Sequence, residues 1–229
     1  IYVIPVMLRE VRPKDIDDAC MELGAELIRA DDAYPGAREQ EQALLHDVAQ
    51  RTDADLDLVR KAIEVIKVYH GPVKRKSGEP FYLHPIAVAQ IVLDYNQDEA
   101  TVLAALLHDT VEDTPMLLEN IETMFNKDVA CIVDGVTHLE SNKDSFHKVK
   151  LSAHENIMML LEVAEKRALY VKIADRMHNM RTIKAKSPKS QRKNAEETLL
   201  FYVPLAERLG LDQAAKEFKE LCFDILSKK

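Results

Sequence analysis

The sequence predicts an all-α protein, a bundle of roughly ten helices with a short arm at its N-terminus. Three observations lead to this fold class. Only 6 of the 229 residues are glycine, apolar side chains recur at spacings of three and four, and runs that alternate between apolar and polar residues are rare. Spacings of three and four place apolar side chains on one face of a helix, whereas a strand needs strict alternation.

The first part of the chain is predicted to contain the arm, four helices and a loop. Residues 1–8 are largely apolar and precede Pro13, so they are expected to form a strand-like arm. Helical spacing then predicts helices over 15–30, 38–50 and 54–69. The segment 70–83 contains two glycines and two prolines, a composition typical of loops. Pro85 then opens a helix that reaches about residue 94, because proline suits the first helical position.

Seven more helices are expected after this point. They are predicted over 98–113, 115–125, 127–134, 152–164, 166–185, 188–208 and 211–227. Thr114–Pro115 and Ser187–Pro188 each combine a capping residue with a proline at the first helical position. Gly135 is expected to end the third of these helices, and the polar stretch 139–150 is expected to be a loop.

Composition excludes several classes of protein. The formal net charge is −8, which disfavours nucleic-acid binding, because affinity for a phosphate backbone depends on clustered Lys and Arg. No apolar run reaches the ~18 residues of a membrane span, so no membrane contact is expected. The cysteines have no ligand-like spacing, which predicts free, buried thiols and a cytoplasmic location. These cysteines are Cys20, Cys131 and Cys222.

The most informative pattern is a series of two histidines and two aspartates, with two more acids one helical turn after its centre. Two imidazoles and two carboxylates can hold one divalent metal through nitrogen and oxygen atoms. The candidate metal ligands are His84, His108, Asp109 and Asp175. Glu112 and Asp113 follow the central pair, and acids beside such a metal can activate water. The pattern therefore predicts a metal-dependent phosphohydrolase.

Helical wheels place these groups on single faces. Glu112 and Asp113 fall in the same arc of about 140° as the preceding His–Asp pair. Asp175, Asn179 and Thr182, at positions i, i+4 and i+7, form a polar stripe that suits a metal beside a phosphate or a sugar. For both faces the alternative is an ordinary solvated helix surface, and for the first histidine it is a helix cap or a core position.

Two basic clusters flank the candidate ligands in this acidic chain. Arg75, Lys76 and Ser77 belong to the loop directly before His84. The second cluster, beside Asp175, consists of Arg176, Arg181, Lys184 and Lys186. Such clusters can hold an anionic substrate next to a metal, and an arginine can also stack on a nucleobase. The alternative is that both are solvated surface cations.

Long stretches around these residues resemble the hydrolase domain of RelA/SpoT enzymes, within the HD phosphohydrolase superfamily. In family order the resembling segments are RKSGEPFYLHP (75–85), AALLHDTVEDT (104–114), VDGVT (133–137), KIADRMHNMRT (172–182) and AERLG (206–210). The resemblance implies that the bundle is an HD domain. It also implies a (p)ppGpp hydrolase domain over 55–229, preceded by an extension over 1–54 that matches no pattern and has no readable role.

The resemblance implies hydrolysis of the alarmones ppGpp and pppGpp, usually with Mn²⁺. Their 3′-pyrophosphate is removed to give GDP or GTP, a reaction that ends the stringent response. By position, the four ligands named above would hold the metal, and Glu112 and Asp113 would position and activate water. Arg75 would stack on guanine. The residues expected to bind the sugar and phosphates are Lys76, Ser77, Asn179, Thr182 and Arg181.

RelA/SpoT enzymes include bifunctional proteins with a following synthetase domain, stand-alone hydrolases, and synthetases whose hydrolase domain has lost the metal motif. All ligand positions and both acids are present here, which argues against the last group. The preferred interpretation is the hydrolase part of a bifunctional protein, with a synthetase domain or a regulatory protein as partner. Three alternatives stay open: a stand-alone hydrolase, a module that binds the nucleotide without turnover, and a hydrolase of another phosphorylated nucleotide such as NADPH.

Overall fold

The computed structural model describes residues 34–141 and 165–227, and every regular element in these two stretches is a helix. The predicted all-α fold class is therefore confirmed. The predicted arm, the helices over 15–30 and 152–164 and most of the predicted loop over 139–150 lie outside the described residues.

The helices of the first stretch are predominantly apolar on their inner faces. Their bounds are α3 Ala37–Arg51, α4 Leu56–His70, α5 Leu83–Val92, α6 Glu99–Leu107, α7 Thr110–Asp113, α8 Leu118–Met124 and α9 Lys127–Ser141. The second stretch begins with a long helix and continues through shorter elements. These are α12 Lys166–Arg181, the 3₁₀ turn η2 Ile183–Ala185, α13 Pro188–Glu197, the π-helical segment η3 Thr198–Tyr202, α14 Val203–Arg208 and α15 Asp212–Leu226.

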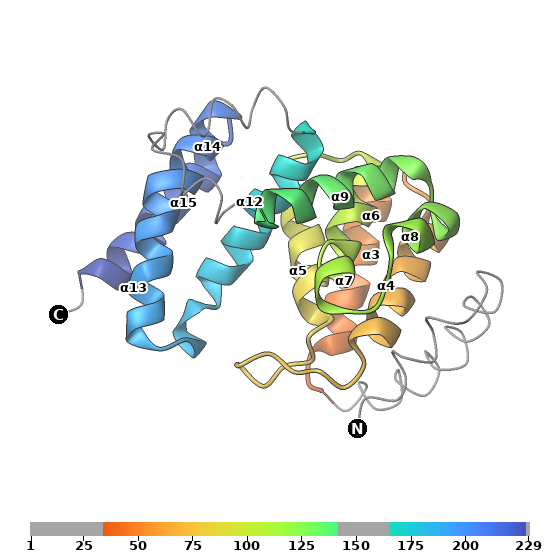
Figure 1. Cartoon of the computed structure of the whole chain (residues 1–229), viewed down its shortest axis with the longest axis horizontal. Helices are drawn as coiled ribbons and strands as arrows, with labels where there is room; N and C mark the ends of the chain where they lie inside the picture. Colours follow the sequence, from red (N-terminus) through yellow and green to blue (C-terminus); the bar gives the residue numbers. More distant parts are fainter. Residues whose placement is uncertain (1–33, 142–164, 228–229) are drawn as a thin grey trace.

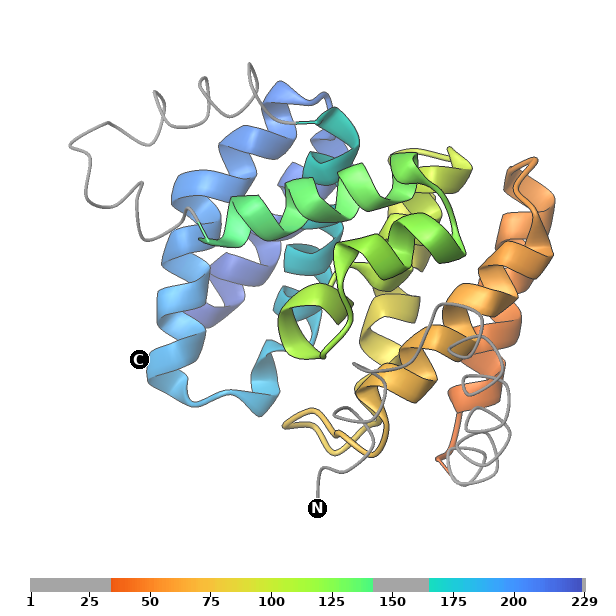
Figure 2. The ribbon, with the colours of Figure 1, turned by 45° about the vertical axis from the view of Figure 1, so that its right-hand side comes forward.

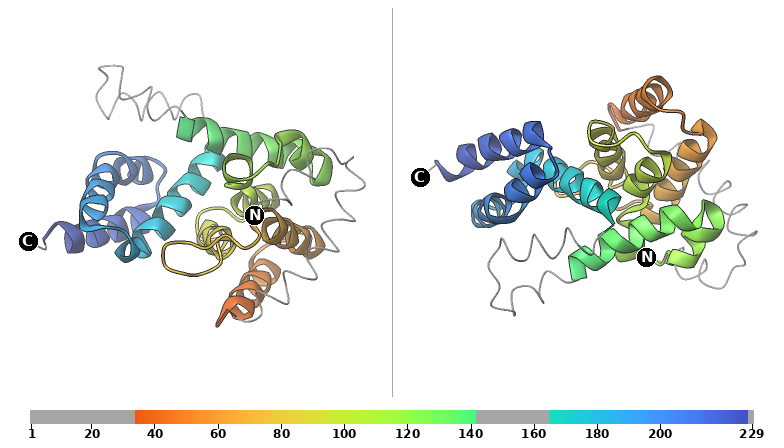
Figure 3. Two further views of the ribbon diagram at one scale, coloured as in Figure 1. Left: turned by 60° about the horizontal axis from the view of Figure 1, so that its bottom comes forward. Right: turned by 90° about the horizontal axis from the view of Figure 1, so that it is seen from above.

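Helix α12 lies between two groups of helices (Figure 1). It packs against α5, α6 and α9 on one side and against α15 on the other, and Figure 2 shows α9 crossing it. The helices α13, α14 and α15 pack together with η3, on the opposite side of the molecule from α3 (Figure 3). A residue of α12 can therefore contact either group, depending on the face that it occupies.

Short polar side chains start several helices, but the predicted start at Thr114–Pro115 is wrong, because α8 begins at Leu118 and the Thr114 hydroxyl donates to the carbonyl oxygen of Thr110 at the end of α7. Asp55 accepts a hydrogen bond from the backbone of Asp57 at the start of α4, at 2.8 Å. Ser187 caps α13, and Pro188 is its first residue. Such caps replace hydrogen bonds that the first turn of a helix cannot make within itself, and each stabilises the helix by about 1 kcal/mol.

The structure also corrects predicted boundaries inside three other helices. Gly135 does not end a helix, because α9 continues to Ser141. A Cβ at Gly135 would lie 3.1 Å from the Cβ of Ala168 on α12, so the missing side chain admits a neighbouring helix. The predicted helix over 98–113 is interrupted after Leu107, and the one over 188–208 contains η3. The π-helical turn ends just before Pro204, whose ring nitrogen lacks the N–H that a regular α-helix would use for a hydrogen bond at this point.

Helix α3 shares the apolar core with α4 and α5. Leu44 and Val48 of α3 are fully buried, and Glu41 pairs at 2.7 Å with the buried ammonium group of Lys67 on α4. The predicted domain boundary after residue 54 therefore lies between two helices with a common core.

The cysteine prediction holds only in part. Cys222 is buried and free, but Cys131 is exposed, so its predicted burial is wrong. Its neighbours Ala130 and Ile132 are buried, so Cys131 lies on the solvent-exposed face of α9. In the described stretches, no helix is both long enough and apolar enough to cross a bilayer.

Candidate active site

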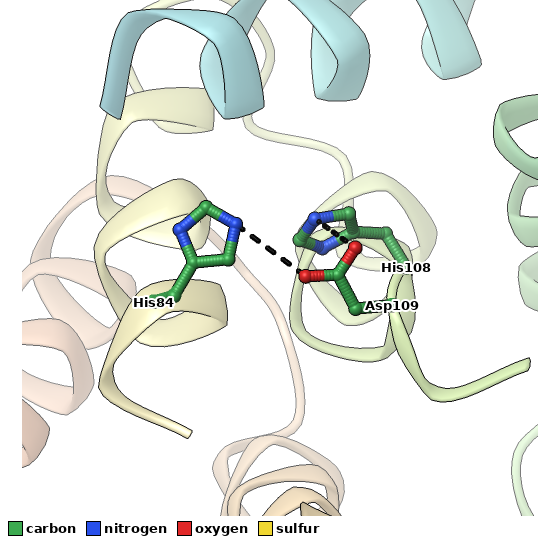
Figure 4. A group of neighbouring side chains, drawn as sticks. All are labelled: His84, His108 and Asp109. Carbon is green, nitrogen blue, oxygen red and sulfur yellow. Dashed lines mark ion pairs between the residues drawn. The ribbon is translucent and has the colours of Figure 1, made fainter. Parts of the chain in front are cut away.

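The four predicted metal ligands lie together, although they come from three parts of the chain. His84 is in the first turn of α5, His108 and Asp109 connect α6 to α7, and Asp175 is in α12. Nε2 of His84 lies 3.4 Å from Oδ2 of Asp109 and 3.2 Å from Oδ1 of Asp175. Nε2 of His108 lies 3.0 Å from Oδ1 of Asp109. Figure 4 shows both imidazoles joined by ion pairs to the Asp109 carboxylate.

These separations fit a single metal ion. Atoms that each lie about 2.1 Å from one ion are about 3.0 Å apart in an octahedron and about 3.4 Å apart in a tetrahedron. The ligand atoms of His84, His108 and Asp109 all lie within 4.8 Å of one another. Asp175 is not one of that group, but its Oδ1 lies 3.2 Å from Nε2 of His84. The arrangement offers two nitrogen and two oxygen donors to a divalent metal.

Side-chain hydrogen bonds shape the backbone at His108 and Asp109. Nδ1 of His108 lies 2.8 Å from the carbonyl oxygen of Ala105, and the Thr110 hydroxyl donates to the carbonyl oxygen of Leu107 at 2.6 Å. Bonds of this kind compete with the hydrogen bonds of a regular helix. They account for the break between α6 and α7, where the two ligands are adjacent in sequence.

The hydrogen bonding of His108 indicates that a cation belongs beside Asp109. A carbonyl oxygen only accepts hydrogen bonds, so Nδ1 of His108 carries its hydrogen. In neutral His108 the Nε2 lone pair then faces the Asp109 carboxylate, 3.0 Å away, and Nε2 is buried without a hydrogen-bond partner. Two lone pairs at this distance repel each other unless a proton or a metal ion lies between them.

The charges of the buried cluster agree with this requirement. Burial lowers the pKa of His108, but the Asp109 and Asp175 carboxylates outweigh it and raise that pKa to about 9. Burial raises the pKa of Asp109, but His108 and His84 outweigh it and lower that pKa to about 2. The pKa of Asp175 is also held far below its usual range, against the effect of burial, mainly by His84. Both carboxylates therefore stay ionised at neutral pH and can bind a cation.

Glu112 and Asp113 lie on α7, one turn after the two adjacent ligands, and both reach solvent. Partial burial and the charge of Asp109 raise the pKa of Asp113. Partial burial also raises the pKa of Glu112, although the charge of Lys172 opposes this shift. A carboxyl with a raised pKa is a better proton acceptor for a water molecule than an ordinary one.

Arg75 is held against α12 by two hydrogen bonds. Its Nη2 donates to Oδ1 of Asn179 at 2.9 Å, and its Nη1 donates to Nδ1 of His178 at 2.9 Å. Asn179 in turn donates from Nδ2 to Oδ1 of Asp175 at 2.5 Å. Two of the predicted substrate-binding residues, Arg75 and Asn179, therefore adjoin the candidate metal ligands.

A tight loop between α4 and α5 positions Arg75. The backbone N–H of Arg75 donates to the carbonyl oxygen of Glu79 at 2.9 Å across the loop. Gly78 in the turn has a φ of 90°, a conformation that side chains disfavour and glycine adopts freely. Lys76 and Ser77 are exposed in the same turn, where a ligand can reach them.

Arg181 and Thr182 end α12. The Thr182 hydroxyl donates to the carbonyl oxygen of His178 at 2.9 Å. The Arg181 guanidinium donates twice to the Glu217 carboxylate on α15, at 2.6 and 2.8 Å, and this contact raises the pKa of Arg181. To bind a phosphate, Arg181 would have to leave Glu217.

A cavity of about 200 Å³ opens between these side chains. It is lined by Arg75, Phe81, His84, Asp109, Asp175 and Asn179. The sequence assigns no role to Phe81 or to His178, whose ring lies 4.9 Å from the His84 ring between centroids. His178 falls on the polar side of its predicted helix, but helical spacing does not reveal a contact with another helix.

Comparison with known proteins gives the following matches. Residues 62–212 match the family model described as HD domain. The chain is similar to the bifunctional (p)ppGpp synthase/hydrolase SpoT of Escherichia coli strain K12, with 42% identity over 170 residues, 73% of this chain and 24% of the relative. It is similar to a probable guanosine-3′,5′-bis(diphosphate) 3′-pyrophosphohydrolase of Synechocystis sp., with 40% identity over 190 residues, 82% of this chain and 25% of the relative.

The chain thus spans about a quarter of the length of these curated relatives. A solved structure described as "A metazoan ortholog of SpoT hydrolyzes ppGpp and plays a role in starvation responses" shares 24% identity with the chain, at a TM-score of 0.48. The match covers 75% of this chain and 94% of that structure.

Proposed function

The chain belongs to the HD domain family, and from this premise we propose that it hydrolyses the 3′-pyrophosphate of ppGpp and pppGpp. One observation carries the proposal: the ligand atoms of His84, His108 and Asp109 lie within 4.8 Å of one another, Asp175 contacts His84 at 3.2 Å, and two acids follow one helical turn after Asp109. Relatives of 40–42% identity whose names include this hydrolase activity support the choice of substrate.

The proposed cofactor is one Mn²⁺ ion, held by the two histidines and two aspartates of the cluster. When bound, such an ion lowers the pKa of a water molecule and offsets negative charge on phosphoryl oxygens. The protein's contribution is to hold its donors ready, with neighbouring ligand atoms 3.0 to 3.4 Å apart. Hydrogen bonds from His108 to Ala105 and from Asn179 to Asp175 orient two of these ligands.

In the proposed reaction, the oxygen of a water molecule bonds to the phosphorus attached to the ribose 3′ oxygen. The bond between that phosphorus and the 3′ oxygen breaks, so pyrophosphate leaves and GDP or GTP remains. The water loses a proton, and the 3′ oxygen gains one. Glu112 or Asp113 accepts the water's proton, a role that their raised pKa values favour.

The substrate is proposed to lie along the loop of Arg75 and the C-terminal half of α12. The edge of the Arg75 guanidinium is bonded to α12, which leaves its planar face as the surface for stacking on guanine. The residues proposed to hold the sugar and phosphates are Lys76, Ser77, Asn179, Thr182 and Arg181. Of these, Arg181 requires the largest change, because its ion pair with Glu217 must open.

The proposed setting is a cytoplasmic protein that also contains a synthetase domain or binds a regulatory protein. Two facts support it. The chain matches only about a quarter of the length of these relatives, and one of them is named as both synthase and hydrolase. The net charge of −8 supports a small nucleotide, rather than a nucleic acid, as the ligand.

The test is release of pyrophosphate from ppGpp with Mn²⁺ and then with excess EDTA. The variants are Asp109→Asn and Glu112→Gln, with Glu122→Gln as a matched control that neutralises an exposed acid on the neighbouring helix α8. We expect metal-dependent turnover in the wild type and the control. Loss of the metal ligand or of the base should reduce turnover by about 100-fold or more.

Absence of ppGpp turnover with Mn²⁺ would refute the proposed activity. Tight binding of ppGpp without turnover would then favour a nucleotide-binding module. Release of phosphate from NADPH would favour a hydrolase of another nucleotide. If Asp109→Asn lost activity and Glu112→Gln kept it, the metal site would stand and the proton acceptor would have to be Asp113 or another group.

A further inference from the structure

The ring of His84 is held on both sides. On one side, Nε2 faces Asp109 and Asp175 at 3.4 and 3.2 Å. On the other side, Nδ1 lies 2.7 Å from Nδ1 of His178 on α12. His84 is almost fully buried, with 4% of its surface exposed, so water does not replace either contact. The partner of Nδ1 therefore decides which nitrogen of His84 carries the hydrogen.

Arg75 fixes the direction of the hydrogen bond between the two histidines. Nδ1 of His178 also lies 2.9 Å from Nη1 of Arg75, and a guanidinium can only donate. A hydrogen on Nδ1 of His178 would point at this donor, so that nitrogen is the acceptor. A nitrogen–nitrogen distance of 2.7 Å requires a hydrogen between the two rings, and it must therefore belong to Nδ1 of His84.

The consequence lies on the metal side of the ring. A neutral imidazole carries one hydrogen, so His84 with its hydrogen on Nδ1 has a lone pair on Nε2. That lone pair faces the two carboxylates at 3.4 and 3.2 Å, so, as at His108, a proton or a metal ion has to lie between them, and the lone pair is placed to bind the metal. If His84 carried its hydrogen on Nε2, it would donate to a carboxylate and could not bind a metal there.

The contacts also form a closed circuit between the loop and the cluster. Arg75 contacts His178, His178 contacts His84, and His84 contacts Asp175. Asp175 accepts from Asn179, and Asn179 accepts from Arg75. Each member is fixed by two neighbours, so a displacement of the loop changes the positions of two candidate metal ligands.

We propose that His178 is a positioning residue that keeps the Nε2 lone pair of His84 free for the metal. Through its contact with Arg75, His178 also couples the loop over 71–82 to the metal site. The proposal rests on the metal site of the proposed function, but not on its substrate or its reaction. His178 then contributes to metal affinity although it does not itself contact the metal. The proposal also predicts that Arg75 affects metal binding before any nucleotide is present.

The test compares His178→Asn with His178→Leu. Asparagine and leucine have nearly the same shape, and the amide oxygen of asparagine lies close to where Nδ1 of histidine would be. The asparagine variant therefore keeps a hydrogen-bond acceptor for His84 and Arg75, and the leucine variant removes it. Binding of Mn²⁺ is measured by calorimetry without nucleotide, and urea denaturation in EDTA measures the stability of each apo-protein.

We expect Mn²⁺ affinity to fall about 10- to 100-fold in the leucine variant, the usual effect of losing a residue that orients a metal ligand. The asparagine variant should stay within about 3-fold of the wild type, on the same reasoning. Arg75→Gln, measured in the same way, should also weaken Mn²⁺ binding. This readout does not involve ppGpp, so it can succeed even if the proposed reaction fails.

Equal Mn²⁺ affinity in the leucine variant and the wild type would overturn the proposal. Equal weakening in both His178 variants would also overturn it, because packing and not the acceptor would then matter. If the leucine variant did not fold, nitrogen-15 NMR of the wild-type histidines would decide. A hydrogen on Nδ1 of His84 supports the proposal, and a hydrogen on Nε2 alone contradicts it.

Discussion

Replacing Gly135 by alanine is expected to push α9 and α12 apart. A Cβ at this position would lie 3.1 Å from the Cβ of Ala168, whereas carbon atoms in contact prefer about 3.5–4.0 Å. A Cβ is fixed to its backbone, so Ala168 cannot turn away. Asp175 lies about two turns further along α12, so the added methyl group acts on the helix that supplies a metal ligand.

Two effects of opposite sign determine the free energy of unfolding of Gly135→Ala. Alanine is favoured over glycine inside a helix by about 1 kcal/mol. Extra volume in a packed core costs about 1–3 kcal/mol. The variant should therefore lose up to about 2 kcal/mol, and for a domain of this size each kcal/mol lowers the melting temperature by about 2–4 °C.

Urea denaturation of a double-mutant cycle separates the two effects. The single variants are Gly135→Ala and Ala168→Gly, and the double variant combines them. In the double variant the helix propensities cancel and the close contact disappears, so its stability should be near that of the wild type. The coupling free energy should be about 1–3 kcal/mol. A stabilisation of Gly135→Ala by about 1 kcal/mol without coupling to Ala168 would refute the argument.

Three further predictions concern the loop, a buried histidine and an ion pair. The Cβ of Gly78→Ala would meet no atom within 4 Å, but the residue must keep a φ of 90°. The free energy of unfolding, measured by denaturation, should therefore fall by about 1–3 kcal/mol. A nucleotide titration should show weaker binding, because the loop positions Arg75. Burial lowers the pKa of His70 from 6.5 to about 4, so the unfolded chain takes up a proton first and stability falls as pH drops from 6.5 to 4. In EDTA, His70→Asn should reduce this slope by up to about 1.4 kcal/mol per pH unit, and an unchanged slope would contradict the assignment. Arg181→Gln removes an exposed ion pair and should change the free energy of unfolding by less than about 1 kcal/mol. Glu217→Gln should free Arg181 and tighten ppGpp binding. Weaker ppGpp binding by Glu217→Gln would count against a phosphate-binding role of Arg181.

Helix positions could be predicted from apolar spacing, but the meaning of single residues within helices could not. Gly135 has the composition signal of a helix end, yet α9 runs through it. A glycine that ends a helix and a glycine that admits a neighbouring helix look alike in sequence. The break after Leu107 depends on side-chain bonds to backbone carbonyls, and spacing does not reveal which local bonds will form.

The site could be predicted as a set of residue types and less well as a set of contacts. His84 and Asp175 were predicted as ligands of one metal, and the structure places them 3.2 Å apart. His178 occupies the same polar stripe as Asp175, but its significance depends on Arg75, which is 103 positions away in the sequence. A tertiary contact of this kind follows from how α5 and α12 pack, and one sequence contains no direct sign of it.

The position of α12 explains why a site near α5 and α6 needs the C-terminal helices. Asp175 faces the candidate metal site, while its neighbour Arg176 is buried on another side of α12. Arg176 donates to Glu197 at 2.9 Å, to Tyr202 at 3.2 Å and to Asn194 at 3.1 Å, and it stacks on the Tyr202 ring. A buried arginine is tolerated only where its hydrogen bonds are satisfied, so α13 and η3 must be in place for α12 to hold this position. Consecutive residues thus connect the metal site to the second group of helices, and the register of α12 is fixed from both sides.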